Sequence, residues 1–173
     1  MSDRPQRPPV GDLPAFDQLD RTHQRIMEQL EQLQLLLTHL DRVGLDAHAR
    51  ALSRSICQFF EHDARQHHAE EEKTIFPGLL KSGSDKIQRE VRRLQQDHGW
   101  LEEDWRAIQP HLESVAEGYA GYDLDMLNHA LPVYSQLYRE HIALEEQMIY
   151  PESRRQYAQL RDGAAERSDD EPA

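Results

Sequence analysis

The sequence of 173 residues contains a single cysteine, Cys57, and this scarcity excludes an internal disulfide. It also excludes iron–sulfur clusters and cysteine-based zinc sites, because each of these needs several thiolates. Any metal that the chain binds must therefore be held by oxygen and nitrogen ligands. The sequence also lacks a run approaching the roughly 18 apolar residues of a membrane span, so we expect no membrane-spanning segment.

Positive charge is in short supply as well. The chain has 20 Lys and Arg residues against 32 Asp and Glu residues, which gives a formal net charge of -12. Such an acidic surface argues against nucleic acid or an anionic membrane as a partner, because phosphates would repel it. Residues 1–12 are polar and rich in proline, without the apolar core of an export signal. We therefore expect a cytoplasmic protein that binds neither nucleic acid nor a membrane.

The apolar residues that are present predict one all-α domain. They recur at alternating spacings of three and four over four segments, which is the period of amphipathic helices that pack into a bundle. Breaks at Val43-Gly44, at 81–84 and at 118–121 separate the four segments. We expect the bundle to span residues 13–161, between a disordered N-terminus (1–12) and a disordered acidic tail (162–173).

One motif occurs twice, at 67–77 and at 141–151. Each copy reads His-x3-Glu-Glu and ends in an aromatic–proline pair, with the proline six residues after the first glutamate. On a helix the histidine and the first glutamate lie one turn apart on the same face, which is the reach that two ligands of one metal ion need. The repeated motif therefore predicts a metal site.

Each of the four segments places one histidine in its apolar phase. A single such histidine is usually a satisfied core residue, but four of them beside buried carboxylates would cost several kcal/mol each without a compensating charge. Two divalent cations would supply that charge, and three carboxylates with one bridging hydroxide would neutralise them. The candidate ligands are His23, His67, Glu71, His98, Glu102, His141 and Glu145.

The types of ligand favour iron. Imidazole nitrogen mixed with carboxylate oxygen suits iron, zinc or manganese, whereas calcium and magnesium prefer oxygen alone. Seven ligands are too many for one tetrahedral zinc, but they suit two iron ions that share carboxylates and keep an open coordination position. Ferritin-type bundles use Glu-x-x-His, so the order His-x3-Glu makes ferritin-like oxidase chemistry less favoured.

At these residues the sequence resembles the hemerythrin-like family of HHE cation-binding domains, over roughly residues 14–155. The resemblance rests on His23, on the two His-x3-Glu motifs and on Asp97-His98. It implies an up-down-up-down four-helix bundle around a non-haem di-iron centre. Two bridging carboxylates and a bridging oxo or hydroxo group would join the two iron ions.

Two questions about the ligand set stay open in the sequence. Oxygen-carrying hemerythrins have His-x3-His in the third helix, whereas here Glu102 holds the second position, either as a ligand or as a solvated charge. His68 with Glu72 also repeats the spacing of four. We prefer His67 with Glu71, because only that pair reproduces the interval to the proline, and we expect His68 at the surface or behind the ligands.

The resemblance implies a protein that binds dioxygen or nitric oxide for sensing, storage or delivery. The alternative is a di-iron enzyme or iron donor in oxidative or nitrosative stress, which repairs iron–sulfur centres or reduces nitric oxide or peroxide. The repair proteins of the family carry an additional cysteine-containing domain, for which we see no room in this chain. A helical interaction module without metal would leave the buried histidines and glutamates uncompensated.

Overall fold

The structure is a computed structural model that describes residues 14–168, with side chains up to residue 162. All the regular elements in this range are helical, so the prediction of an all-α fold is confirmed. The predicted disorder of residues 1–12 concerns a segment outside the described residues, and so does the last part of the predicted acidic tail, 169–173. No helix between residues 14 and 168 is long and apolar enough to cross a membrane.

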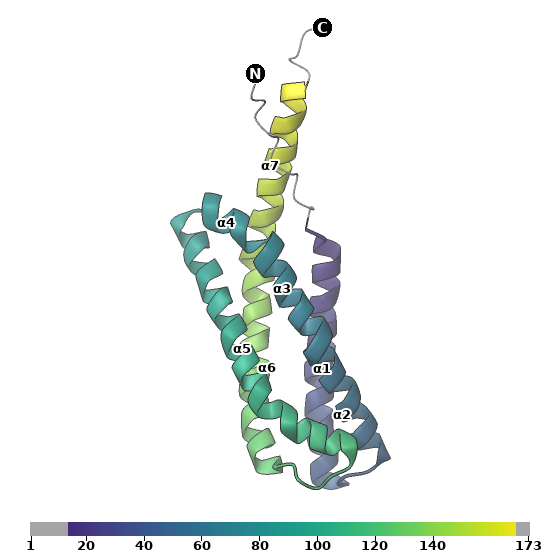
Figure 1. The fold of residues 1–173 in the computed structure, drawn as a ribbon. Coiled ribbons are helices and arrows are strands. Elements are labelled where there is room, and N and C mark those ends of the chain that lie inside the picture. The colour runs from purple at the N-terminus through teal and green to yellow at the C-terminus, as the bar shows by residue number, and fades with distance from the viewer. Residues whose placement is uncertain (1–13, 169–173) are drawn as a thin grey trace, which may run out of the picture.

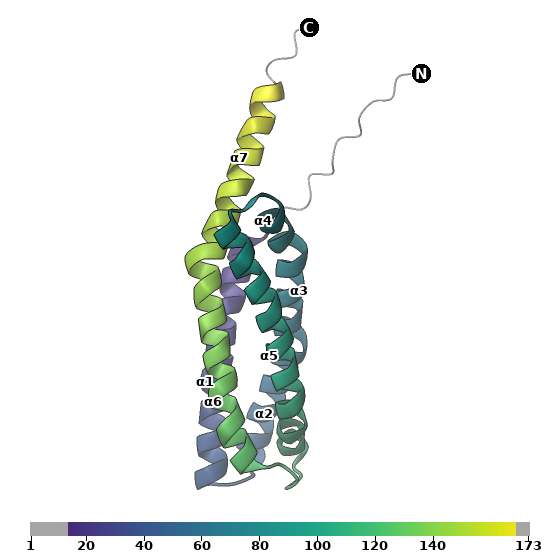
Figure 2. The same ribbon diagram turned by 90° about the vertical axis from the view of Figure 1, so that its left-hand side faces the viewer.

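The described chain forms four helical rods that lie side by side (Figures 1 and 2). The first is α1 (Phe16–Arg42), and the third is α5 (Asp85–Glu117). The second joins α2 (Ala47–Phe59), η1 (Phe60–Ala64), α3 (Arg65–Thr74) and α4 (Phe76–Ser82). The fourth joins α6 (Leu124–Leu144), η2 (Glu145–Ile149) and α7 (Tyr150–Ser168). Helices α1 and α5 each pack against both α2 and α6, which closes the bundle.

Local chemistry explains where the rods begin and end. Three helices begin at a side chain that accepts a hydrogen bond from the first turn: Asp46 before α2, Ser84 before α5 and Asp123 before α6. Gly44 and Gly118 follow the ends of α1 and α5 with φ angles of 93° and 86°, a left-handed conformation that favours glycine.

Two single turns of π-helix interrupt the second and the fourth rod. These turns are η1 and η2, and η2 begins at Glu145, the first glutamate of the second motif. The backbone N–H of Tyr150 donates to the carbonyl of Glu145, five residues earlier. Such a turn rotates the following helix relative to a regular α-helix, and π-turns are frequent at functional sites. Beyond η2 the helix continues through Pro151 to Ser168, past the end that we expected near residue 161.

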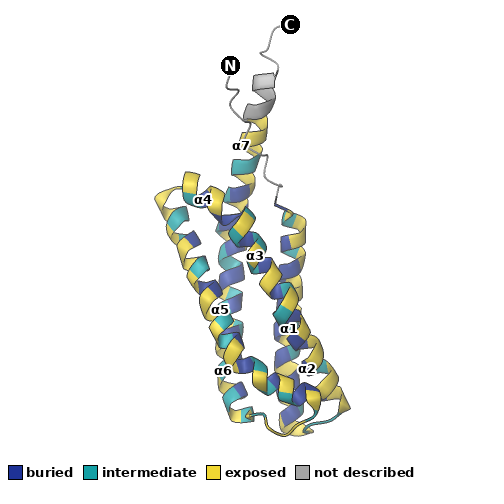
Figure 3. Cartoon of the chain, in the orientation of Figure 1, coloured by how far each residue is buried: buried dark blue, intermediate teal, exposed yellow. Residues whose placement is uncertain are grey.

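Buried residues lie along the inward faces of the rods (Figure 3). They form two apolar clusters with a polar layer between them. The larger cluster includes Ile26, Phe60, Trp105 and Tyr138. The smaller cluster consists of Leu19, Ile75, Phe76, Leu79, Val91, Leu94, Ile149 and Tyr150. Along each rod, the buried histidine lies between a residue of one cluster and a residue of the other. The fold therefore holds the four histidines at one level of the bundle, shielded from water on both sides.

Candidate metal centre

The polar layer brings together six of the seven residues that the sequence suggested as ligands. They are His23 on α1, His67 and Glu71 on α3, His98 on α5, His141 on α6 and Glu145 at the start of η2. The two glutamates are completely buried, and the most accessible of the six, His98, is 8% exposed. All four rods contribute at least one of these side chains, so the layer exists only in the packed bundle.

The six residues form two overlapping groups. In one group the possible ligand atoms of His23, His67, Glu71 and Glu145 lie within 4.8 Å of one another, and in the other those of Glu71, His98, His141 and Glu145 do. The two glutamates belong to both groups.

Each carboxylate presents one oxygen to each group. Glu71 Oε1 lies 3.3 Å from His67 Nε2, and Glu71 Oε2 lies 3.4 Å from His98 Nε2. Glu145 Oε2 lies 3.1 Å from His23 Nε2, and Glu145 Oε1 lies 3.0 Å from His141 Nε2. Both side chains thus span the interval between one pair of histidines and the other, as a carboxylate does when it bridges two sites.

The hydrogen bonding of this layer fits a metal site. Glu71 Oε2, both carboxylate oxygens of Glu145 and both ring nitrogens of His67 are buried without a hydrogen bond. Buried polar atoms are normally paired, and unpaired buried carboxylates are especially costly. Converging nitrogen and oxygen atoms of this kind are the donors that a transition-metal ion needs.

Further carboxylates hold three of the histidines from behind. His98 Nδ1 lies 2.9 Å from Glu72 Oε1, and His23 Nδ1 lies 3.0 Å from Glu146 Oε1. Asp97 Oδ2 lies 3.6 Å from His141 Nδ1, a looser contact. In His98 and His23 the carboxylate accepts the hydrogen bond, so Nδ1 of each ring is the donor and Nε2 faces the centre.

Glu72 and Glu146 were not expected to have this role. Each is the second glutamate of its motif, and each reaches the histidine of a neighbouring rod that carries only one candidate ligand histidine. The sequence did contain a signal for this role, because both copies of the motif have two consecutive glutamates. Only the first glutamate lies on the same helix face as the histidine, so metal binding by that face does not explain the second.

Tyr150 is a further residue that the sequence analysis did not single out. Its hydroxyl donates a hydrogen bond to Glu71 Oε1 and lies 3.2 Å from His23 Nε2. Its ring stacks on His23, with centroids 5.1 Å apart and an interplanar angle of 9°. Burial, together with the nearby carboxylates, raises the pKa of Tyr150, so the hydroxyl keeps its proton and acts as a donor. In the first motif the same position is Phe76, which stacks on His98 without a hydroxyl.

The protonation of the layer without metal follows from its charges. Burial lowers the pKa of His67 to about 4, so this imidazole is neutral. Burial also acts to lower the pKa of His141, but Glu145 and Asp97 outweigh it and raise that pKa to about 10. In the same way, His141 and His23 outweigh burial and hold the pKa of Glu145 below its usual range. Protons therefore balance the carboxylates, and a metal cation would displace them.

Of the two positions that we expected for His68, at the surface or behind the ligands, the structure excludes the surface. His68 is half-buried, its Nε2 is inaccessible and without a hydrogen bond, and its ring stacks on His98 with centroids 4.1 Å apart. Its ligand atom lies within 4.8 Å of those of His98 and His141. Helix α3 thus directs two consecutive histidines at the layer, His67 toward one group and His68 toward the other.

Glu102 is the one candidate ligand that belongs to neither group. Its carboxylate accepts hydrogen bonds of 3.1 Å and 2.8 Å from the guanidinium of Arg65, and Arg106 lies 3.3 Å away. About one third of the Glu102 side chain, 32%, is exposed. The other histidines, His39, His48, His62, His111 and His129, also belong to none of the groups.

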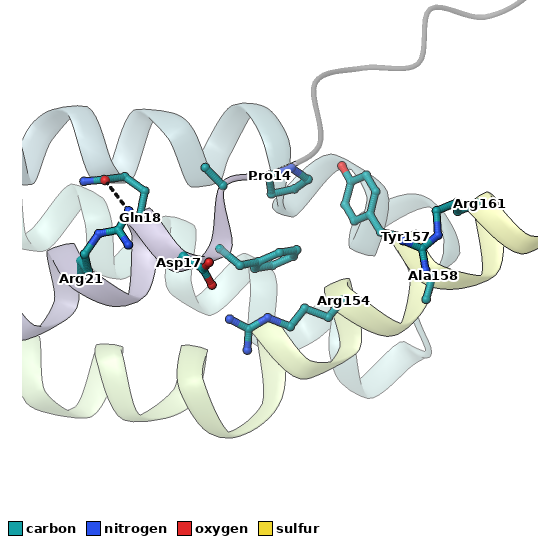
Figure 4. A pocket seen from close by; sticks show the side chains of 10 residues that line it. Pro14, Asp17, Gln18, Arg21, Arg154, Tyr157, Ala158 and Arg161 are labelled. Carbon is teal, nitrogen blue, oxygen red and sulfur yellow. Dashed lines mark hydrogen bonds between the residues drawn. The ribbon is translucent and has the colours of Figure 1, made fainter.

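A hollow of about 280 Å³ leads from the surface to one side of the layer. It lies between α1 and the second rod, and His67 and Thr22 are among its lining residues. Arg25 on α1 and Asp63 on η1 also line it and form an ion pair of 2.6 Å across it. A larger hollow of about 600 Å³ lies between the start of α1 and α7, beside Arg21, Arg154 and Tyr157 (Figure 4), but none of the candidate ligands lines it.

A helical bundle with buried imidazoles and carboxylates that fit a metal ion defines a metal-binding protein. The chain belongs to the family of hemerythrin HHE cation-binding domains, because the model of that family matches residues 15–153. This confirms the resemblance seen in the sequence. An uncharacterised protein of Haemophilus influenzae is 29% identical over 134 residues, which span 78% of this chain and 76% of that relative. No solved structure matches the chain significantly.

Proposed function

We propose that this protein holds two non-haem iron ions in its polar layer and binds dioxygen or nitric oxide there, for sensing, storage or delivery. The observation that carries the proposal is the position of Glu71 and Glu145, each with one oxygen toward each pair of histidines. A single ion would need only one of the two groups. Two ions use both, and they explain why both carboxylates are shared.

In this proposal His23 and His67 would hold one ion, and His98 and His141 would hold the other. Glu71 and Glu145 would be shared by both ions, as would an oxo or hydroxo group. Glu102 is left out of the proposed ligands, because Arg65 already engages its carboxylate. The packing of α1 and α5 against both α2 and α6 supports the expected up-down-up-down order of the rods.

Iron would supply a reversible change between its ferrous and ferric states and an open position for a small molecule. The residues of the chain exclude water and orient the ligands. The two apolar clusters exclude water above and below the layer. Glu72 and Glu146 fix the rings of His98 and His23, so that Nε2 of each ring points inward.

The hollow beside His67 supports a small, neutral ligand. Its volume of about 280 Å³ admits a diatomic molecule, and it approaches the layer on the side of His23 and His67. The net charge of -12 disfavours small anions. A di-iron enzyme that reduces nitric oxide or peroxide is the second candidate. It is favoured by the hydroxyl of Tyr150, a protonated donor in contact with Glu71 and His23.

Metal analysis of the protein purified from iron-sufficient cells, with an optical spectrum before and after reduction and exposure to air, tests the proposal. We expect about two iron ions per chain and absorption bands that disappear on reduction and return with dioxygen. A chain that folds fully without metal and takes up none when iron is offered contradicts it. Uptake of nitric oxide in proportion to iron supports binding, whereas continuous consumption of nitric oxide with a reductant supports the enzyme.

A further inference from the structure

The two halves of the polar layer correspond residue by residue. Aligning the two motifs pairs His67 with His141, Glu71 with Glu145, and Glu72 with Glu146. The same alignment pairs His68 with Ile142, so at this position the halves differ in chemistry. Ile142 is 5% exposed and belongs to the larger apolar cluster, whereas the ring of His68 lies against the imidazoles of the layer.

We propose that His68 supplies a fifth nitrogen ligand, through Nε2, to the ion that His98 and His141 hold. This inference rests on the proposed function, because it needs an ion at that position. It makes the two ions unequal, with three nitrogen ligands on one and two on the other.

The geometry around His68 supports this role. The ring lies nearly parallel to that of His98, at an interplanar angle of 17°, and it meets the edge of the His141 ring at a centroid distance of 5.6 Å. Tyr138 also stacks on the ring of His68, with centroids 5.7 Å apart. These three neighbours fix the plane of the ring. One donor atom from each of the three histidines lies within 4.8 Å of the others, close enough to share one ion.

The Nε2 atom of His68 has no other partner among the described residues. It is buried and makes no hydrogen bond with them, although leaving a buried polar group unpaired is costly. An imidazole nitrogen without a proton has a free lone pair, and a metal ion accepts that lone pair.

His68 and Glu102 are alternative sources of the same extra ligand, and their surroundings favour His68. Both line a small hollow of about 10 Å³ next to Arg65. Arg65 holds Glu102 by two hydrogen bonds, away from the buried carboxylates, whereas the Nε2 of His68 is free. The second rod, which already supplies His67 and Glu71, thus also supplies His68 as a ligand. The third rod does not supply Glu102.

Anaerobic titration of the metal-free protein with ferrous iron tests this inference. We expect the wild type to bind two equivalents. In His68→Ala the first equivalent should bind as before, and the affinity for the second should fall by about 100-fold, the upper end of the effect of losing a residue that supports a metal ligand. Added imidazole should restore part of that affinity, because it fits the space left by the ring.

Two variants serve as matched controls. Ile142→Ala shortens the equivalent side chain of the second motif, and Glu102→Gln removes the rival carboxylate; both should bind two equivalents with wild-type affinity. His68→Gln keeps most of the side-chain volume, so its loss of the second ion would separate ligation from packing. Circular dichroism of each metal-free variant checks the fold.

The outcomes separate the two proposals. Wild-type affinity for both equivalents in His68→Ala and His68→Gln overturns the role of His68 and leaves the di-iron proposal standing. Loss of the second ion in Glu102→Gln, with no loss in His68→Ala, overturns it in favour of Glu102. A wild-type chain that binds no ferrous iron overturns the proposed function itself.

Discussion

Glu146 Oε1 lies 3.0 Å from His23 Nδ1, so the second glutamate of the second motif holds the histidine of the first rod. The equivalent glutamate of the first motif, Glu72, holds His98 of the third rod in the same way. Each motif therefore acts twice. Its first glutamate faces the centre of the layer. Its second glutamate orients a histidine on a neighbouring rod, and that rod supplies no buried glutamate of its own.

Replacing Glu146 by alanine should weaken iron binding by about 10–100-fold, the usual effect of removing a residue that orients a metal ligand. The reason is that His23 would lose the acceptor that fixes its ring and its tautomer. Competition with a chelator of known affinity measures the change. Glu103→Ala, at an exposed position of α5, is the control and should bind iron as the wild type does. Equal affinities in the two variants would remove this role from Glu146.

Tyr150→Phe should lower the free energy of unfolding of the metal-free protein by about 1.5–3 kcal/mol, because it removes a hydrogen bond to a charged group. Tyr157→Phe is a matched control, since the Tyr157 hydroxyl donates to the neutral backbone carbonyl of Thr74. That change should cost about 0.5–1.5 kcal/mol. Urea denaturation measures both. A smaller loss for Tyr150→Phe than for Tyr157→Phe would show that the contact with Glu71 contributes little.

Removing the ion pair across the hollow, by Arg25→Ala with Asp63→Ala, should speed the arrival of nitric oxide at the iron severalfold. The equilibrium affinity should stay the same, because both side chains lie outside the proposed ligands. Stopped-flow absorbance on the ferrous protein measures the rate. Arg154→Ala, which breaks the 2.6 Å pair with Asp20 beside the other hollow, should leave the rate unchanged. An unchanged rate in the double variant would mean that the ligand enters by another route.

Cys57 should be inert toward thiol reagents in the folded protein. Burial, with Glu113 and Glu61 nearby, raises its pKa from 9.0 to about 12. At pH 8 the reactive thiolate is then about a thousandfold scarcer than in the unfolded chain. Above pH 9 the thiol of the unfolded chain loses its proton while that of the folded protein keeps it. The free energy of unfolding therefore falls as the pH rises above 9. A chromogenic disulfide reagent, with and without denaturant, measures the difference. Rapid reaction of the native protein contradicts it.

Much of the fold and part of the layer could be predicted from the sequence. The period of the apolar residues predicted an all-helical protein, and the paired motifs predicted the family; both are confirmed. The phase of each helix also indicated seven side chains as ligands, and the bundle brings six of them together, without Glu102. These features depend on local spacing, which a helix converts directly into a shared face.

The remaining features depend on contacts between rods, which spacing does not show. Glu102 turns to Arg65, a residue on another rod, and no pattern within the third segment contains that information. His68 is adjacent to His67, about 100° around the helix, and a helical period assigns only one of them to the centre. Helix α3 faces both groups, so the rings of both histidines lie against the layer. The π-turn at η2 is likewise absent from the helical period. It pairs the backbone N–H of Tyr150 with the carbonyl of Glu145, so the side chain of Tyr150 points in a different direction from the one it would have in a regular α-helix.

The contact between His23 and Glu146 joins residues 123 positions apart, and this has a consequence for the order in which the protein matures. Chains emerge from the ribosome with the N-terminus first, so a nascent chain with three rods holds His23, His67, Glu71 and His98 but neither His141 nor Glu145. Both groups are incomplete at that stage. In the proposed centre, iron capture would therefore have to wait for the last rod, and the ion would bind to a bundle whose four rods are already present.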